Sequence, residues 1–407
     1  MSTLLATPAP APARSTLTGW LAVVSVMIAI FSIVTTEILP IGLLTSIGAD
    51  FTISDGMAGL MMTAPGLIAA VAAPVATVAT GRIDRRIMLC LFMFLLILAN
   101  ALMAVAPEYW VVLASRVLIG ITIGGFWSIA AGLAERLVPA ASASRANAVI
   151  FSSVPLGSVL GVPAGTLLGE IAGWRTAFVV VGVLSAAVLG MLLTFLPPLP
   201  ARAVTRASVL RGLLRGINIR FALLATFLVV LAQFGAYTYV TPFLEQVTHV
   251  GPGMITLLLL IYGVAGILGN FLGGAAITRR PRATLGCAAA MMAIATLSLP
   301  VLGRWEAGAL VLLIIWGIGY GAVPVSTQAW FAKAVPNAPE AASVLFTAAF
   351  QATFALGALT GGLVVDRGSP ATVMLLGGLT AALAIVAVVT HAGQRRTWPD
   401  RQDLPRG

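Results

Sequence analysis

Charged residues are scarce in this chain. Only 9% of its 407 residues are charged, whereas 59% belong to the hydrophobic set. A soluble globular domain carries about 25% charged and about 45–50% apolar residues, so this composition excludes a water-soluble fold. Cysteine is scarce too. Cys90 and Cys287 fall in different apolar stretches, so no disulfide is expected.

Lysine, histidine and clustered acids are also nearly missing. The only lysine, Lys333, follows Ala332, so a phosphate-binding loop ending in Gly-Lys-Ser/Thr is absent and an ATP-driven pump would need a separate ATPase subunit. An intramembrane enzyme would need clustered His, Cys, Asp or Glu. The acids are instead spread over the loops, and neither His249 nor His391 has a metal-ligand or nucleophile partner nearby. We therefore expect no enzymatic activity, no metal and no cofactor.

What the chain does contain is twelve long apolar stretches. A helix needs about 20 mainly apolar residues to cross the hydrocarbon core of a bilayer. We predict spans near residues 20–44, 56–80, 87–106, 109–132, 146–170, 176–196, 219–244, 254–277, 285–302, 307–330, 341–364 and 371–391. The predicted fold class is therefore an all-α integral membrane protein with the lipid bilayer as its surroundings.

The basic residues predict the orientation of these spans, because Lys and Arg are retained on the cytoplasmic side. With both termini inside, 19 of the 23 basic residues fall on the termini and on every second loop. The outer loops keep only Arg175, Arg304 and Arg367, and Arg116 lies within the fourth span. The net charge of +10 thus follows from topology and does not indicate a nucleic-acid partner.

The chain is also internally duplicated. Two glycines, a basic residue and a proline in and after the fourth span recur 197 positions later: Gly120, Gly124, Arg136 and Pro139 match Gly317, Gly321, Lys333 and Pro336. We predict a disordered tail (1–18), an N-terminal six-helix bundle (19–196), a cytoplasmic linker (197–218), a C-terminal six-helix bundle (219–391) and a second tail (392–407). Internal repeats with a site at their interface are typical of secondary transporters.

Several short motifs resemble one transporter family. Residues 36–44 (TEILPIGLL), 116–120 (RVLIG), 124–127 (GGFW) and 157–165 (GSVLGVPAG) are similar to motifs of the major facilitator superfamily, in its twelve-span drug:proton antiporter branch. The residues of these motifs are most similar to those of bacterial purine nucleoside, sugar and chloramphenicol exporters. The resemblance covers nearly the whole chain and implies two pseudo-symmetric six-helix bundles, export by proton antiport, and a bacterial inner-membrane location.

One family motif is incomplete here. The loop between the second and third spans usually reads Gly, three residues, Asp, Arg, one residue, Gly. Asp84 and Arg85 are present, but Thr80 and Ile87 replace the two glycines. A gating role for Asp84 and Arg85 is what the resemblance implies, although from its place in the sequence Asp84 is better suited to structural contacts at the inner ends of the helices.

The fifth span carries glycines at every fourth position. Gly157, Gly161, Gly165 and Gly169 share one helix face, where a neighbouring backbone can approach closely, and Pro163 bends the same helix. In the family's fold the fifth and eighth spans meet across the two halves. The eighth span carries further glycines, namely Gly263, Gly266, Gly269, Gly273 and Gly274. The resemblance therefore implies a glycine-lined sliding seam there, with ordinary tight packing as the alternative.

Glu37 is the acid that we place inside the membrane. An ionisable group there costs roughly 2.5–3.5 kcal/mol on insertion scales, so it is a functional candidate. Burial disfavours the charged form of a carboxyl group, and we expect Glu37 to carry the proton. It could instead reach water at the outer interface or bond a neighbouring helix. Arg116, the only intramembrane base, would either bias the proton site or satisfy backbone carbonyls.

Polar and aromatic groups near the middle of the membrane are the candidate substrate contacts, since small-ligand sites combine apolar walls with a few polar groups. They are Trp127, Gln233, Tyr237, Asn270, Trp316, Tyr320, Gln351 and Phe354. For each of them, helix–helix hydrogen bonding or placement at the lipid interface is the alternative. The sequence thus predicts a monomeric secondary transporter that exports a small neutral or amphipathic molecule in exchange for protons. A proton-coupled or facilitated importer is the alternative, and an intramembrane enzyme is less favoured than either.

Overall fold

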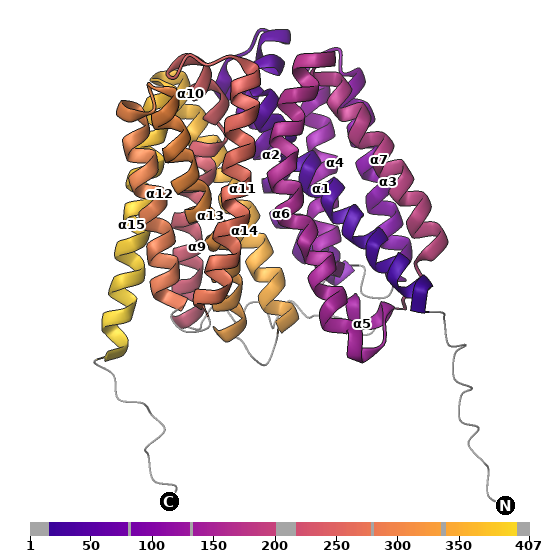
Figure 1. Cartoon of the computed structure of the whole chain (residues 1–407). Helices are drawn as coiled ribbons and strands as arrows, with labels where there is room; N and C mark the ends of the chain where they lie inside the picture. Colours follow the sequence, from indigo (N-terminus) through magenta and orange to yellow (C-terminus); the bar gives the residue numbers. More distant parts are fainter. Residues whose placement is uncertain are drawn as a thin grey trace, which may run out of the picture.

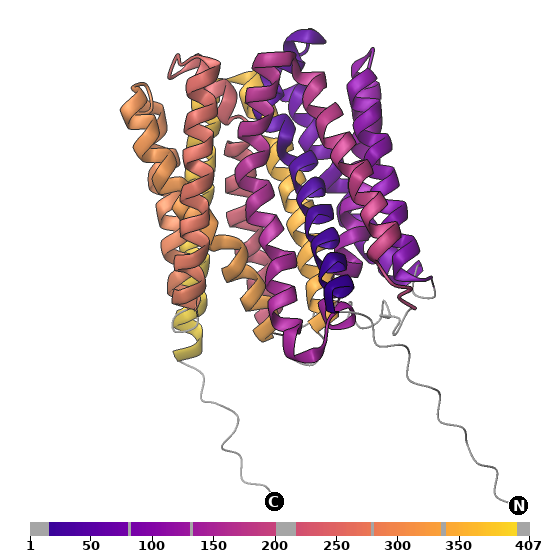
Figure 2. The same cartoon turned by 45° about the vertical axis from the view of Figure 1, so that its right-hand side comes forward.

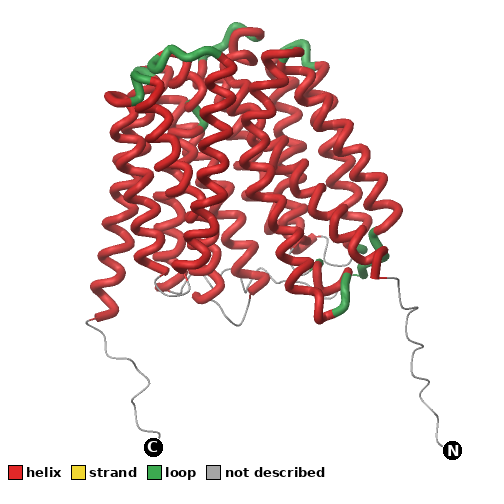
Figure 3. Tube along the Cα trace, viewed as in Figure 1, coloured by secondary structure: helices red, strands yellow, loops and turns green. Residues whose placement is uncertain are grey.

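A computed structural model of the chain describes residues 16–79, 83–130, 133–200, 217–277, 281–334 and 339–396. Within these ranges the regular elements are all helices, and twelve of them are long and apolar enough to cross a membrane (Figure 3). The all-α fold class is thereby confirmed. Most of the predicted tails (1–18 and 392–407) and of the predicted linker (197–218) lies outside the described residues.

The helices fall into an N-terminal and a C-terminal half (Figure 1). The N-terminal half contains α1 (Thr16–Asp50), α2 (Asp55–Ala79), α3 (Arg85–Val105), α4 (Tyr109–Ala130), α5 (Ala134–Leu137), α6 (Ala140–Ala172) and α7 (Trp174–Phe195). The C-terminal half contains α9 (Ile217–Tyr237), α10 (Val240–Gln246), α11 (Pro252–Ile277), α12 (Pro281–Leu302), α13 (Glu306–Ala334), α14 (Pro339–Arg367) and α15 (Pro370–Arg396).

The seventh predicted span, 219–244, is not one helix, and its prediction as a continuous helix is wrong. α9 ends at Tyr237 and α10 begins at Val240. Pro242 explains the break, because it has no N–H to donate to the carbonyl of Thr238 and its ring crowds that carbonyl. The backbone N–H of Tyr239 instead bonds the Ala236 carbonyl at 3.0 Å, which makes a tighter turn.

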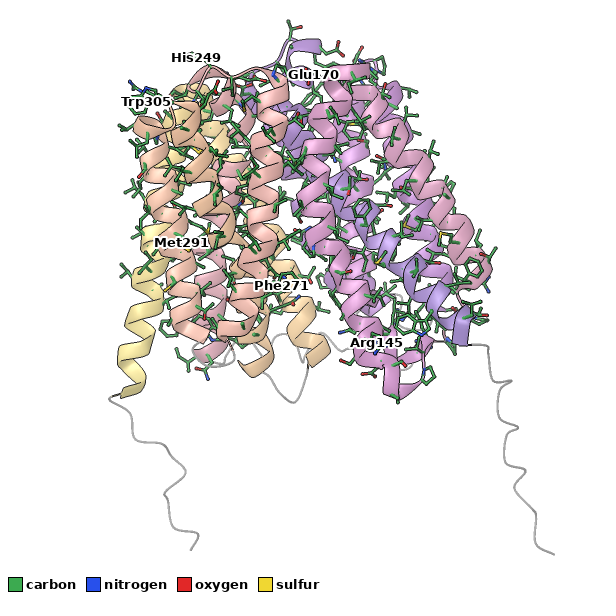
Figure 4. All side chains as sticks on the ribbon, in the orientation of Figure 1. Arg145, Glu170, His249, Phe271, Met291 and Trp305 are labelled. Carbon is green, nitrogen blue, oxygen red and sulfur yellow. The ribbon has the colours of Figure 1, made fainter. Side chains whose placement is uncertain are left out.

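The two halves lie side by side, and α1 begins on the same face of the molecule on which α15 ends (Figure 1). We call this the terminal face and the other the opposite face. Among the contacts between the halves are those of α2 with α14, of α6 with α11, of α1 with α10 and of α4 with α14. Towards the terminal face α6 and α11 diverge in both views (Figures 1 and 2). Phe271 of α11, 71% exposed, lies in that region (Figure 4).

The glycines of α6 do not line the contact with α11, so the part of the glycine seam expected from the fifth span is wrong. An added Cβ would lie 3.0 Å from Val34 at Gly157, 3.1 Å from Ile38 at Gly161 and 3.0 Å from the Leu39 carbonyl at Gly165. These partners all belong to α1, in the same half. The glycines and the buried Pro163 all belong to the one helix α6. The four-residue spacing places the glycines on one face of this helix, and that face packs against α1.

A glycine of the eighth predicted span does lie where α6 meets α11, as expected. A Cβ at Gly263 of α11 would lie 2.9 Å from the Cα of Val159. Nearby, the hydroxyl of Thr256 lies 2.7 Å from that of Thr166. The fifth and eighth predicted spans therefore meet across the halves as expected, and the glycine at the contact belongs to α11.

Candidate functional site

Pro40 leaves a free carbonyl in α1 next to Glu37. Because proline has no N–H, the carbonyl of Thr36, four residues earlier, lacks its usual helical donor. Arg116 of α4 supplies one, with Nη1 2.9 Å from Thr36 O. The guanidinium is fully buried and also faces the ring of Phe178, 5.6 Å from its centroid. Of the two roles considered for Arg116, this geometry provides the carbonyl contact, one residue away from Glu37.

Further polar groups surround this point of α1. Asn100 of α3 donates to the Leu96 carbonyl at 2.9 Å and to Thr36 Oγ1 at 3.4 Å. Among the described residues, the Nε and Nη2 atoms of Arg116 and the Oδ1 atom of Asn100 are buried without a hydrogen-bond partner. Buried polar groups are nearly always paired, so these atoms are exceptions. The region between α1, α3 and α4 therefore contains hydrogen-bond donors and an acceptor that no protein group satisfies.

The carboxylate of Glu37 faces the other half. Gln351 of α14 donates to it, with Nε2 2.8 Å from Glu37 Oε1. Both side chains are buried, at 8% and 5% exposure. Glu37 thus lies on the boundary between the halves and bonds the C-terminal half directly. Gln351, a predicted substrate contact, lies against the candidate proton site.

Four side chains of the C-terminal half form a compact aromatic and polar cluster, which we call the aromatic box: Gln233, Tyr237, Tyr262 and Trp316. Trp316 donates to Gln233 Oε1 at 2.8 Å, and Gln233 Nε2 donates to the Tyr262 hydroxyl at 2.7 Å. The rings of Tyr237 and Tyr262 stack with centroids 4.6 Å apart, and Trp316 meets both edge-on. These two bonds fix the orientation of the Gln233 amide and leave it one N–H and one oxygen lone pair for a ligand.

A second aromatic group connects the box to Gln351. Phe234, next to Gln233, contacts Phe354 with ring centroids 4.0 Å apart and Tyr320 at 5.9 Å. Side chains of the other half, Ile38 and Met62, belong to the same buried cluster. Tyr237, Trp316, Tyr320 and Phe354 are therefore brought together in this cluster. Gln233 bonds Trp316 within it, and Gln351 lies one turn from Phe354 on α14 and bonds Glu37 at the boundary between the halves.

Two predicted substrate residues lie elsewhere. Trp127 of α4 packs on Phe151 of α6, with ring centroids 6.1 Å apart; both side chains are partly buried and lie against the core of the N-terminal half. Asn270 is partly exposed and follows Tyr262 by eight positions on α11, about 12 Å along the helix. An apolar groove on the surface of the C-terminal half lies between α11, α12 and α13. Its lining includes Gly269, Leu272 and Cys287 and none of the candidate residues.

The motif residues Asp84 and Arg85 contact the segment that follows α7. The Asp84 carboxylate caps α3 by accepting from Arg86 N at 2.8 Å, and it accepts from Leu199 N at 2.9 Å. Arg85 N donates to the Leu199 carbonyl at 2.9 Å. These contacts stay within the N-terminal half and hold the start of the polypeptide link between the halves against α3.

Polar contacts join the halves near the opposite face. Gln246 donates to Asp55 at 3.1 Å, and Thr45 donates to Glu245 at 3.0 Å. Burial raises the pKa of Glu245 above its ordinary value; the hydrogen bond from Thr45 lowers it and the nearby Asp55 raises it further. Contacts of this kind hold the halves together on the face opposite to the termini.

Tyr262 and the effect of Pro40 on Arg116 are functional features that were not predicted from the sequence. Tyr262 is one of only five tyrosines and lies in an otherwise apolar stretch, where a buried hydroxyl needs a partner. The spacing of Pro40 four residues after Thr36 was visible as well. A buried proline frees the carbonyl four residues earlier, so it marks where an intramembrane arginine can bond.

Comparison with known proteins agrees with this architecture. A family model described as Major Facilitator Superfamily matches residues 22–347 and 222–403. The chain is 36% identical over 377 residues to a Pseudomonas aeruginosa protein named transcription regulatory protein OpdE, covering 91% of this chain and 94% of the relative. It is 31% identical over 379 residues to the purine ribonucleoside efflux pump NepI of Escherichia coli K12, covering 93% and 96%.

Two solved structures share the fold. A bacterial homologue of the human lysosomal transporter Spinster superimposes with a TM-score of 0.70 at 16% identity, covering 95% of this chain and 100% of that one. The human organic anion transporter MFSD10 gives a TM-score of 0.67 at 17% identity, covering 91% and 99%. At these identities the likeness concerns the fold alone.

Proposed function

Since this chain belongs to the major facilitator superfamily and is a multi-pass membrane transporter, we propose that it exports small neutral or amphipathic molecules in exchange for protons. Purine ribonucleosides are the favoured substrates, because a 31% identical relative over 93% of the chain is named a purine ribonucleoside efflux pump. Membership in this family also identifies the chain as a transporter and not an enzyme.

One arrangement carries the proposal. A carboxylate buried to 8% exposure at the boundary between the helical halves accepts a hydrogen bond from Gln351. The packed rings of Phe354 and Phe234 connect Gln351 to a box of stacked aromatic rings that contains an amide. An intramembrane carboxyl group is the chemistry that binds and releases protons, and aromatic rings with a few polar groups suit a planar heterocycle such as a purine. Glu37 is thus the proposed proton site, and the box is the proposed wall of the substrate site.

The positive-inside pattern of the sequence supports a cytoplasmic terminal face. In that orientation the contacts on the opposite face close the carrier towards the outside. Substrate would enter from the cytoplasmic side or the inner leaflet, the halves would rock about their boundary, and protonation of Glu37 from outside would accompany the return. The proposed location is the bacterial inner membrane, and the proposed working unit is a monomer.

Two alternatives remain in competition. Proton-coupled or facilitated import uses the same fold and the same carboxylate, with the fluxes in the other direction. A regulatory role is favoured by one observation, the 36% identity to a relative named as a transcription regulatory protein. Vesicle transport separates all three, because a regulator moves no ligand and an importer moves it inward.

The test is a ligand panel in everted membrane vesicles with an imposed pH gradient. Inosine, adenosine, a neutral sugar, chloramphenicol and a dicationic dye are each added, and loss of the gradient is recorded. We expect the nucleosides or another neutral ligand to discharge the gradient and the dication to have little effect. A response to the dication alone contradicts the proposed substrate class, and a response to none contradicts proton exchange with these ligands.

A further inference from the structure

The hydrogen bond between Gln351 and Glu37 joins the two halves at the proposed proton site. The residues are 314 positions apart and meet at 2.8 Å. α1 carries Glu37 and belongs to one half, whereas α14 carries Gln351 and belongs to the other. A motion that carries α14 away from α1 therefore has to break this bond.

Neighbouring contacts hold Gln351 in place. A Cβ added at Gly66 of α2 would lie 2.8 Å from the Gln351 carbonyl, so the two backbones nearly touch. One turn further along α14, the ring of Phe354 packs on Phe234. The backbone of Gln351 is thus fixed between α2 and the aromatic group next to the box, and only its amide reaches across to Glu37.

The strength of this bond depends on the charge of Glu37. A hydrogen bond to an ionised carboxylate is roughly twice as strong as one between neutral groups. Arg116 of α4 and Tyr320 of α13 are the other charged or titratable groups within electrostatic reach of Glu37. Arg116 gives its hydrogen bond to the Thr36 carbonyl. Gln351 is therefore the side chain that donates to the Glu37 carboxylate from the other half.

We propose that Gln351 is a positioning residue that locks the carrier closed on the opposite face while Glu37 is ionised and no substrate is bound. This inference rests on the function proposed above. Protonation of Glu37 weakens the lock, and a substrate that draws the Gln351 amide towards the aromatic box opens it. Such a lock prevents leakage, because an empty carrier that changed faces freely would let protons or substrate flow downhill alone.

The experiment measures the opening of the opposite face without a ligand. Spin labels are attached to cysteines at Glu170 of α6 and Trp305, two exposed positions on that face in different halves (Figure 4). Cys90 and Cys287 are replaced by serine in this background. The distance distribution of the purified full chain in lipid nanodiscs is recorded from mildly alkaline to mildly acidic pH.

In the wild-type background, we expect the separated population to grow as the pH falls. Gln351→Met keeps the length of the side chain but removes the amide, so it should raise the separated population at alkaline pH by about tenfold and flatten the pH response. Glu37→Gln should remove the response as well. Thr353→Val, on the same helix, removes a hydroxyl that bonds only the Ala349 carbonyl of α14 and should behave as wild type.

Three outcomes overturn the inference. If Gln351→Met responds to pH as the wild type does, Gln351 is not the lock, while proton coupling through Glu37 stands. If Glu37→Gln keeps the full response, it originates from other carboxylates between the halves: Asp55, Glu245 and Asp366. If the wild type itself does not respond to pH, both the lock and the proposed proton coupling are contradicted.

Discussion

Asp366, at the end of α14, accepts a hydrogen bond from the hydroxyl of Ser54, just before α2, with an Oγ–Oδ2 distance of 2.8 Å. Its second oxygen accepts from the backbone N–H of Gly56 at 2.9 Å. A carboxylate of the C-terminal half thus caps the first turn of a helix in the N-terminal half, where N–H groups lack helical partners and negative charge is favourable.

Asp366→Ala should loosen the opposite face, because both bonds across the halves are lost. Hydrogen bonds to charged groups contribute about 1.5–3 kcal/mol, and at this exposed position we expect the lower end, about a tenfold change in opening. The measurement is the rate at which a cysteine placed at Met62, buried between the halves, reacts with a water-soluble maleimide.

Asp50→Asn is the matched control for this prediction. Asp50 lies on the same face and pairs with Arg175 at 2.6 Å, but both residues belong to the N-terminal half. Its loss should leave the cysteine reaction unchanged. Equal rates in Asp366→Ala and in the parent would show that the cap contributes nothing to closure.

Gly263 and Gly165 should respond differently to a bulky side chain. Gly263→Val places atoms against Val159 across the halves and should slow transport by about tenfold or more while the halves still fold. Gly165→Val places atoms against Leu39 within one half and should lower the unfolding temperature instead. Gly274→Val, where an added Cβ meets nothing within 4 Å, is the control. Normal transport by Gly263→Val would mean that α6 and α11 need not approach closely.

The hydrogen bond from Trp316 to Gln233 should contribute measurably to stability. A double-mutant cycle of Trp316→Phe and Gln233→Leu, followed by thermal unfolding in lipid, should give a coupling of about 0.6 kcal/mol, the average for hydrogen bonds between membrane helices, and at most about 1.7. Trp305→Phe, whose side chain is 63% exposed, is the control for tryptophan replacement itself. Purely additive effects of the two substitutions would contradict a bond across the box.

The orientation can be tested by labelling intact cells in a background without Cys90 and Cys287. A cysteine at Trp305, exposed on the opposite face, should react with an impermeant reagent from outside, whereas one at Ser144, exposed towards the terminal face, should not. Labelling of the cysteine at Ser144 from outside would show that the terminal face lies outside the cell, contrary to the predicted topology.

Apolar length predicts the spans well, because crossing a bilayer fixes both the composition and the minimum length of a helix. It predicts helix ends poorly, since α1 runs to Asp50 instead of to residue 44. The spacing of Gly157, Gly161 and Gly165 predicts that another helix packs closely on this face. The spacing does not determine which helix that is, and in the structure it is α1.

The composition of the site was predictable in part. Glu37 could be identified from the sequence, because an acidic residue inside an apolar span is energetically costly and therefore rare. Its partner Gln351 could not be assigned, because the two are 314 residues apart and any polar group in the C-terminal half could have met Glu37. Trp127 was equally plausible from its sequence position, but it is only partly buried and packs against the core of its own half.

The central claim is that Glu37 couples export to protons, and gradient-driven accumulation in proteoliposomes tests it most directly. With a pH gradient of about one unit, a one-proton exchanger should concentrate labelled inosine by about tenfold, and a protonophore should abolish this. Glu37→Gln should still exchange labelled for unlabelled inosine, because the fold and the aromatic box remain, but it should not concentrate inosine. Accumulation by Glu37→Gln at the wild-type level would contradict the account.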